Sequence, residues 1–410
     1  MTTSIGRAWR LAAWAAFATI VGVRISAAQG VVPGSSGGGS ASANPNIGLV
    51  LNGYYSSFSK DVPFEVPGFV FGGETGPGEP GFNLGESELN IYGNIDPYLF
   101  ASVVVAITPE GEAEVEEASI QTLALPFGFT VKAGRFFSGI GYMNARHRDA
   151  DDFSDAPLPY QAFLGGQFGD AGIQVKWLAP ADLFFELGVE TFRGEEYPAG
   201  GAASDGAGAG TAFVKVGGDI GDSGSYLVSF SQLQAKSVAR TTGEDVRESS
   251  FTGDTTVRIV GAIWKWAPMG NFKHTNLTVQ GEYFQREEDG VYTFDPAGAP
   301  VTVNMKGGDT GTQSGWYAQA RYQFFQRWRV GIRQAQIKAD APKDSAAKGT
   351  ALDPQGETPK IATVMAEYDP SEFSRIRLQY SQDDSVPDEP VARWYLQYVV
   401  TFGAHAAHPY

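Results

Sequence analysis

The sequence contains no cysteine, and only four of its 410 residues are histidine. Without cysteine the chain has no disulfide, no thiolate metal ligand and no cysteine nucleophile. Basic residues are also scarce, with 30 lysines and arginines against 46 acidic residues and a net charge of −16. Such a balance argues against a nucleic-acid partner, because backbone phosphates are bound by basic patches.

Long apolar runs are missing beyond the N-terminus, so no later segment approaches the ~20 apolar residues of a transmembrane helix. The N-terminus itself reads as a secretory signal peptide over residues 1–28. Arg7 and Arg10 precede the apolar stretch 11–23, and Ser26-Ala27-Ala28 offers a cleavage site before Gln29. The alternative is a membrane-anchoring helix. Residues 29–45 are rich in Gly and Ser and predict a flexible tail.

What the chain does contain, from residue 46 to 410, is a repeated two-residue alternation of apolar and polar side chains. Near the C-terminus the apolar set is Trp394, Leu396, Tyr398, Val400 and Phe402, and the set between them is mostly polar. Successive side chains of a strand point to opposite faces. Trp and Tyr recur near the ends of such segments, as in the aromatic girdles of outer-membrane barrels.

The connections between these segments alternate in length, which favours a membrane barrel over a soluble sandwich. Short turns such as residues 95–97 and 178–180 alternate with long loops such as 137–170, 238–254, 288–313 and 339–358. The sequence therefore predicts an all-β, transmembrane antiparallel barrel of about sixteen strands, with short periplasmic turns and long extracellular loops. The strands are expected to start near Ile47, Leu84, Tyr98, Glu112, Phe127, Ala171, Ala181, Thr211, Gly224, Thr255, His274, Ser314, Trp328, Pro359, Glu372 and Val391.

Four segments resemble a proteobacterial family of porin-like outer-membrane proteins. They are FNLGESELN (82–90), KAGRFFSGIGY (132–142), WLAPAD (177–182) and WYLQYVVTFGAHAAH (394–408). Members of this family resemble phosphate-selective porins, and some are labelled zinc-regulated TonB-dependent receptors. The resemblance implies a channel and a homotrimer. The receptor label fits poorly, because such receptors resemble 22-stranded barrels with a plug domain, whereas this sequence predicts only about sixteen strands.

Several arginines occupy the alternate, polar positions of the last predicted strands, which are expected to face the lumen. They are Arg321, Arg329, Arg333, Arg375, Arg377 and Arg393. Neighbouring strands lie about 4.8 Å apart, so these side chains are expected to form a basic patch on one side of the lumen. Such a patch favours anions. The alternative is that scattered arginines merely solvate a polar interior.

The third long loop, residues 137–170, is expected by resemblance to fold inward and constrict the channel. Its charged residues are Arg146, His147, Arg148, Asp149, Asp151, Asp152 and Asp155. An acidic loop facing a basic wall predicts a transverse field that sorts solutes by charge. The alternative is an exposed, solvated charge run.

Metal-binding candidates are weak. His147 with Asp151 and its neighbours could bind Zn²⁺ or Ca²⁺, and His405 with His408 offers a second pair. The acidic run Glu112, Glu114, Glu116 and Glu117 could collect cations or bind Ca²⁺ that bridges lipopolysaccharide, although solvation is the simpler interpretation.

The sequence carries no phosphate-binding loop, no His-Glu-x-x-His zinc helix and no Gly-x-Ser-x-Gly elbow. We therefore expect no enzyme and no cofactor. The prediction is an exported porin-like channel in the outer membrane, surrounded by lipid and lipopolysaccharide, that passes small hydrophilic solutes or ions. The alternatives are a metal-related TonB-dependent receptor, an outer-membrane enzyme and a structural barrel.

Overall fold

The fold was analysed in a computed structural model that describes residues 45–72, 75–108, 111–201, 206–242, 248–294, 299–305 and 312–404. The predicted signal peptide, nearly all of the predicted tail and the pair His405 and His408 lie outside the described residues.

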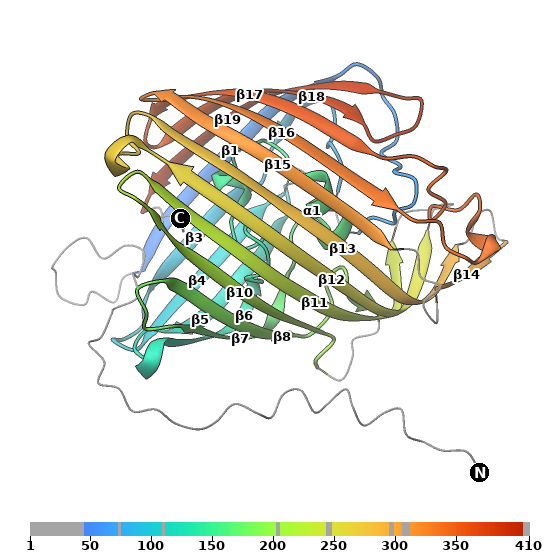
Figure 1. The fold of residues 1–410 in the computed structure, drawn as a ribbon, viewed down its shortest axis with the longest axis horizontal. Helices are drawn as coiled ribbons and strands as arrows, with labels where there is room; N and C mark the ends of the chain where they lie inside the picture. The colour runs from blue at the N-terminus through green and yellow to red at the C-terminus, as the bar shows by residue number, and fades with distance from the viewer. Residues whose placement is uncertain are drawn as a thin grey trace, which may run out of the picture. The chain divides into compact units, whose positions relative to one another are not determined.

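Sixteen strands in the described part of the chain form the wall of a closed antiparallel β-barrel (Figure 1). Each wall strand pairs with the next wall strand along the chain, and β1 pairs with β19 from Gly48–Gly403 to Phe58–Arg393. Closure leaves no wall edge unpaired, as a lipid environment requires. The wall strands are β1 (Asn46–Phe58), β3 (Ser87–Asn94), β4 (Leu99–Ile107), β5 (Ala113–Thr122), β6 (Phe129–Phe137), β7 (Gly169–Leu178), β8 (Phe184–Phe192), β10 (Ala209–Ile220), β11 (Gly224–Thr242), β12 (Ser249–Trp266), β13 (Asn276–Phe294), β15 (Gln313–Phe325), β16 (Trp328–Ala339), β17 (Lys360–Ser371), β18 (Ser374–Asp384) and β19 (Val391–Gly403).

The remaining elements are short and belong to turns and loops. They are the strands β2 (Gly81–Leu84), β9 (Gly200–Gly201) and β14 (Val301–Met305), the helix α1 (Leu158–Leu164), and the 3-10 turns η2 (Pro126–Gly128), η3 (Arg148–Ala150), η5 (Pro268–Gly270) and η7 (Ser345–Ala347). Within the described ranges, no helix is both long and apolar enough to cross a membrane.

The two faces of the wall differ in polarity, as the alternation predicts. In β19, Trp394, Leu396 and Tyr398 are each about half exposed on the outer face, whereas Arg393 and Gln397 are buried on the inner face. β15 follows the same rhythm, with Gln319 inside and Tyr322 outside, whereas β10 and β12 also bury apolar side chains such as Phe213 and Ile259. An apolar outer surface around a polar interior is the arrangement that suits a barrel in lipid.

The predicted barrel is confirmed, and each predicted strand start lies near the start of a wall strand. The largest error is at Thr255, because β12 already begins at Ser249. Residues 238–254 and 288–313 were predicted as loops, but parts of them extend the hairpins of β11, β12 and β13 to 18 or 19 residues. A bilayer crossing needs only about 9–11 residues, so the outer faces of these ends need not be apolar and did not reveal them.

Candidate functional site: the lumen and its inward loop

The loop between β6 and β7, residues 138–168, is called the inward loop because it lies against inner-face side chains of the wall. Its helix α1 is buried along its whole length and contacts β13, β15 and β16. The Phe163 ring stacks on Phe284 of β13 with centroids 5.9 Å apart. Arg286 of β13 donates a hydrogen bond of 3.0 Å to the Ala162 carbonyl.

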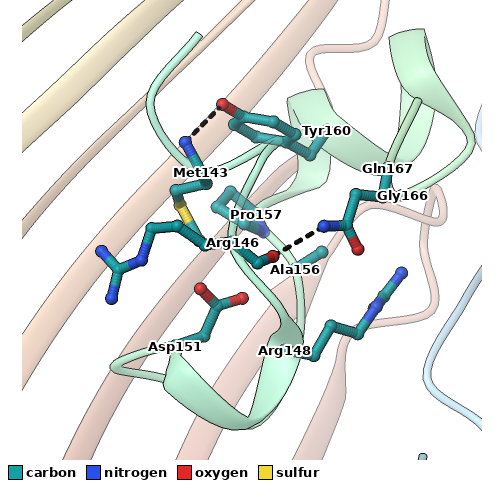
Figure 2. A pocket seen from close by; sticks show the side chains of 9 residues that line it. All are labelled: Met143, Arg146, Arg148, Asp151, Ala156, Pro157, Tyr160, Gly166 and Gln167. Atoms are coloured by element: carbon teal, nitrogen blue, oxygen red, sulfur yellow. Dashed lines mark hydrogen bonds between the residues drawn. The ribbon is translucent and has the colours of Figure 1, made fainter. Parts of the chain in front are cut away.

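Local sequence explains why the inward loop folds compactly. Pro157 and Pro159 flank the start of α1, and Gly165 ends it with a positive φ of 64°. Figure 2 shows the loop around a small internal cavity, in which Tyr160 accepts a hydrogen bond from the Met143 amide (3.1 Å). Gln167 also donates to the Arg146 carbonyl (2.6 Å). These hydrogen bonds connect residues within the loop and hold it in a compact conformation.

The six predicted arginines lie on the inner face of neighbouring strands, from β15 to β19. Two of them pair with carboxylates of the inward loop. Arg321 lies 3.2 Å from Asp152, and Arg333 lies 2.6 Å from Asp155. The acidic loop and the basic wall are therefore in direct contact.

Two further arginines hold the backbone of the same loop. Arg375 donates to the Asp149 carbonyl (2.8 Å), and Arg377 donates to the Asp151 carbonyl (2.6 Å). Arg375 and Arg377 therefore bind the loop through main-chain oxygens, which depend on the path of the loop rather than on its side chains.

Sequence reasoning missed the acidic side chain at the centre of this wall, Glu367 of β17. Its carboxylate is 2.6 Å from Arg329, 3.3 Å from Arg375 and 2.7 Å from Arg377. The strand register places Glu367 directly opposite Arg329 on one side and Arg377 on the other. Asp383 in turn pairs with Arg393 at 2.5 Å. The wall is thus a paired network and not an open basic face.

Glu367→Gln is expected to destabilise the folded barrel strongly. Removing one partner of a buried charge pair costs about 3–5 kcal/mol, because the other charge stays buried without compensation. The temperature at which the folded band disappears in semi-native electrophoresis should fall. Glu372→Gln, an exposed turn variant, is the control, and an equal response of the two variants would contradict the assigned role.

Two acidic residues of the inward loop have opposite ionisation behaviour. Burial raises the pKa of Asp151 to about 7, although Arg146 and Arg148 lie beside it (Figure 2). Burial acts in the same direction on Asp152, but Arg321 and Arg146 outweigh it and hold the pKa of that carboxyl below its usual value. At neutral pH Asp152 is therefore fully charged, whereas Asp151 is near its midpoint.

The raised pKa of Asp151 predicts a pH dependence of stability. In the unfolded chain Asp151 loses its proton near pH 4, whereas in the folded chain it keeps the proton up to about pH 7. The free energy of unfolding should therefore fall as pH rises from about 4 to about 7. The fall should be about 1.4 kcal/mol for each unit by which the folded and unfolded pKa values differ. Asp151→Asn should remove this part of the slope. Unfolding midpoints of both proteins between pH 4 and pH 8 test this, and parallel curves would refute it.

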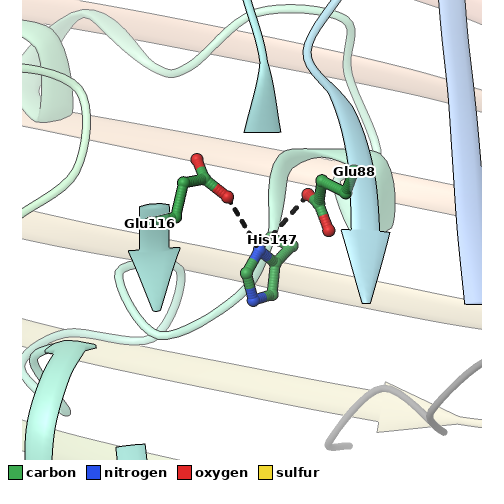
Figure 3. Close-up of side chains that lie close together, drawn as sticks. All are labelled: Glu88, Glu116 and His147. Carbon is green, nitrogen blue, oxygen red and sulfur yellow. Dashed lines mark ion pairs between the residues drawn. The ribbon is translucent and has the colours of Figure 1, made fainter. Parts of the chain in front are cut away.

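The carboxylates found near the His147 imidazole are glutamates of β3 and β5, which the sequence had not paired with it. The Nδ1 of His147 is 3.2 Å from Glu88 and 3.6 Å from Glu116 (Figure 3). Its Nε2 is 3.8 Å from Glu117. Burial opposes the charged imidazolium, but Glu116 and Glu88 raise the pKa of His147 well above its ordinary value. Within the acidic run, Glu112 and Glu114 stay exposed.

A β-bulge explains how two consecutive glutamates reach one imidazole. The pairing of β4 with β5 shifts between Val104 and Val105, which leaves Glu116 as the extra residue. A bulge re-aims a side chain that regular alternation would turn away. The same irregularity interrupts the alternation of side chains along β5.

The inward loop is therefore complementary to two walls. His147 and Arg148 face the glutamates of the β3–β5 side, and Arg148 lies 3.5 Å from Glu86. Asp152 and Asp155 face the arginines of the other side. Along the chain the basic part of the loop comes first and faces the acidic wall. The acidic part follows and faces the basic wall.

A second group missed by sequence reasoning is a set of inner-face lysines on the remaining arc of the barrel. Lys176 lies 3.4 Å from Glu186. Lys132 and Lys215 lie over the rings of Phe136 (5.4 Å) and Phe213 (5.0 Å). Among the described residues neither of these two has a carboxylate within 4 Å. The alternation of β6, β7 and β10 could have revealed all three.

These features define a class of fold: a closed sixteen-stranded antiparallel barrel of the porin type, with a loop folded inside it. No family model matches the chain. An uncharacterized protein of Aquifex aeolicus is 29% identical over 391 residues, which cover 89% of this chain and 80% of that protein.

Solved structures agree on the fold. A loop L8 deletion mutant of OmpT, an outer membrane protein of Vibrio cholerae, is similar with a TM-score of 0.56 and 12% identity, covering 88% of this chain and 99% of that one. The outer membrane channel DcaP of Acinetobacter baumannii is similar with a TM-score of 0.55 and 14% identity, covering 89% and 99%. A trimer form of OmpT has a TM-score of 0.52, with 12% identity and coverage of 88% and 99%. At these identities the similarity concerns the fold.

Proposed function

We propose that the protein is an outer-membrane channel through which small hydrophilic solutes diffuse passively. The observation that supports this most is the closed wall, with an apolar outer face and with charged and amide side chains among the buried residues of the inner face. In this proposal residues 1–28 direct export, residues 29–45 form a tail and residues 46–410 form the barrel. Lipid and lipopolysaccharide surround it, and the trimer form of OmpT supports a homotrimer.

The inward loop is proposed to set the width of the channel. It crosses from β6 to the arginines of β15–β18 and is fixed there by ion pairs and by bonds to its backbone. Solutes would then pass beside this loop, where charges on the loop and on the walls act on them.

An anion bias is proposed to come mainly from the lysines of β6, β7 and β10. Arg333 and Arg377 are buried and already paired, so a solute cannot replace their partners at low cost. Lys132, Lys176 and Lys215 are only half-buried. A partly exposed cation attracts passing anions more effectively, and Lys132 and Lys215 have no carboxylate within 4 Å among the described residues.

Solute uptake by liposomes tests the transport proposal. Proteoliposomes should swell in isotonic solutions of small sugars, and the rate should fall steeply as the sugar becomes larger. Liposomes with heat-denatured protein are the control. If folded protein gave no swelling with the smallest sugars, the alternatives of an occluded receptor, an enzyme or a structural barrel would replace the channel.

A further inference from the structure

Three ligand atoms from separate segments converge on the β3–β5 side of the barrel (Figure 3). They are Oε1 of Glu88, Oε2 of Glu116 and Nδ1 of His147, and all lie within 4.8 Å of one another. Nδ1 is 3.2 Å from the Glu88 oxygen and 3.6 Å from the Glu116 oxygen. Both carboxylates and the imidazole are thus directed at one small volume.

Nδ1 of His147 forms ion pairs with the two carboxylates, but none of the three atoms makes a hydrogen bond to any further group within the described part of the chain. Glu88 is only 2% exposed, so water does not solvate its carboxylate freely. A buried polar atom without a hydrogen bond costs about 1–3 kcal/mol. Three such atoms in one place indicate a shared partner.

The spacing of the atoms fits a metal ion better than a water molecule. Ligands at about 2.0–2.1 Å from a tetrahedral ion stand roughly 3.3–3.4 Å apart. Groups bonded to one water at about 2.8 Å would stand roughly 4.6 Å apart. The observed 3.2 and 3.6 Å lie around the value for the ion.

The surroundings orient the ligands as a metal site requires. Glu117 lies 3.8 Å from the other imidazole nitrogen, in the position of the carboxylate that commonly supports a metal-bound histidine. Asn90 donates to the second oxygen of Glu88 (3.4 Å), and the Phe137 ring packs edge-on against His147. Glu116 and Phe137 also line a cavity of about 180 Å³, which gives an ion a route to the site.

We propose that Glu88, Glu116 and His147 bind a divalent transition-metal ion of the zinc class, with at least one coordination position left to solvent. One imidazole nitrogen with two carboxylate oxygens is a donor set that Zn²⁺ accepts. Because His147 belongs to the inward loop, the ion ties that loop to β3 and β5. Binding does not depend on the proposed transport and is measured without it.

The test measures Zn²⁺ binding to the folded, detergent-solubilised protein by titration calorimetry. His274, His405 and His408 are first changed to Gln, so that His147 is the only imidazole in the chain. This background should bind one Zn²⁺ per chain. His147→Gln and Glu116→Gln should each weaken binding at least ~100-fold, and Glu117→Gln should weaken it about 10–100-fold. Saturating Zn²⁺ should also raise the unfolding temperature of the background protein.

Glu114→Gln is the matched control, since Glu114 is an exposed neighbour in the same strand and should leave binding unchanged. Semi-native electrophoresis establishes that every variant is folded. Glu116→Gln, at the edge of the cavity, keeps the test decisive if His147→Gln fails to fold. The proposal is overturned if the background binds no Zn²⁺, or if Glu116→Gln and Glu114→Gln behave alike.

Discussion

Deletion of residues Asp149–Asp155 is expected to increase the single-channel conductance, on the order of twofold, because a sixteen-stranded barrel without an inserted loop leaves a wide aqueous channel. The segment removed supplies both loop carboxylates that pair with the wall, at Asp152 and Asp155. It also supplies the carbonyls held by Arg375 and Arg377. Its loss removes the ion pairs and bonds that hold this part of the loop to β15–β18, while α1 still packs against β13, β15 and β16.

A milder variant separates the release of the loop from the loss of its volume. Asp152→Asn with Asp155→Asn keeps every backbone atom and removes the two carboxylate charges, and with them the ion pairs to Arg321 and Arg333. It should produce an intermediate and noisier conductance, recorded in planar bilayers. Unchanged conductance in the deletion variant would show that the inward loop does not limit the current.

Changing Lys132, Lys176 and Lys215 to Gln is expected to shift the reversal potential in a salt gradient toward cations. These three side chains are half-buried on the inner face, and only Lys176 has a carboxylate within 4 Å in the described part of the chain. The shift should be largest at low ionic strength, because screening is weak there and the Debye length reaches about 30 Å at 0.01 M.

Lys60→Gln provides the control for this selectivity change. Lys60 pairs with Glu389 at 2.6 Å, and both are about half exposed, so its loss should leave the reversal potential where it was. If the triple lysine variant kept the original selectivity while Arg321→Gln changed it, the arginine wall and not the lysines would set the bias.

The barrel could be predicted because lipid requires an apolar outward face on every strand that crosses the membrane. Leu396 must face outward and Gln397 inward whatever their neighbours are, so the alternation is visible strand by strand. The same rule fails beyond the membrane. There the ends of β11 and β12, around residues 238–254, still bury one side, including Arg240 and Phe251, but their outer side needs no apolar residues, and the segment was predicted as a loop.

The contacts inside the lumen could not be read from alternation alone, since they depend on register. Glu367 neutralises the arginine wall because two hairpins place it opposite Arg329 and Arg377. The partners of His147 depend in addition on the bulge at Glu116. The sequence identified charged residues of the right kind, but not which of them meet.

Planar-bilayer recording of the purified, folded protein tests the central claim most directly. A channel predicts stepwise current increases on insertion, followed by steady current at moderate voltage, in the full chain with no ligand added. A protein that inserts as a folded barrel and conducts no steady current would contradict the account.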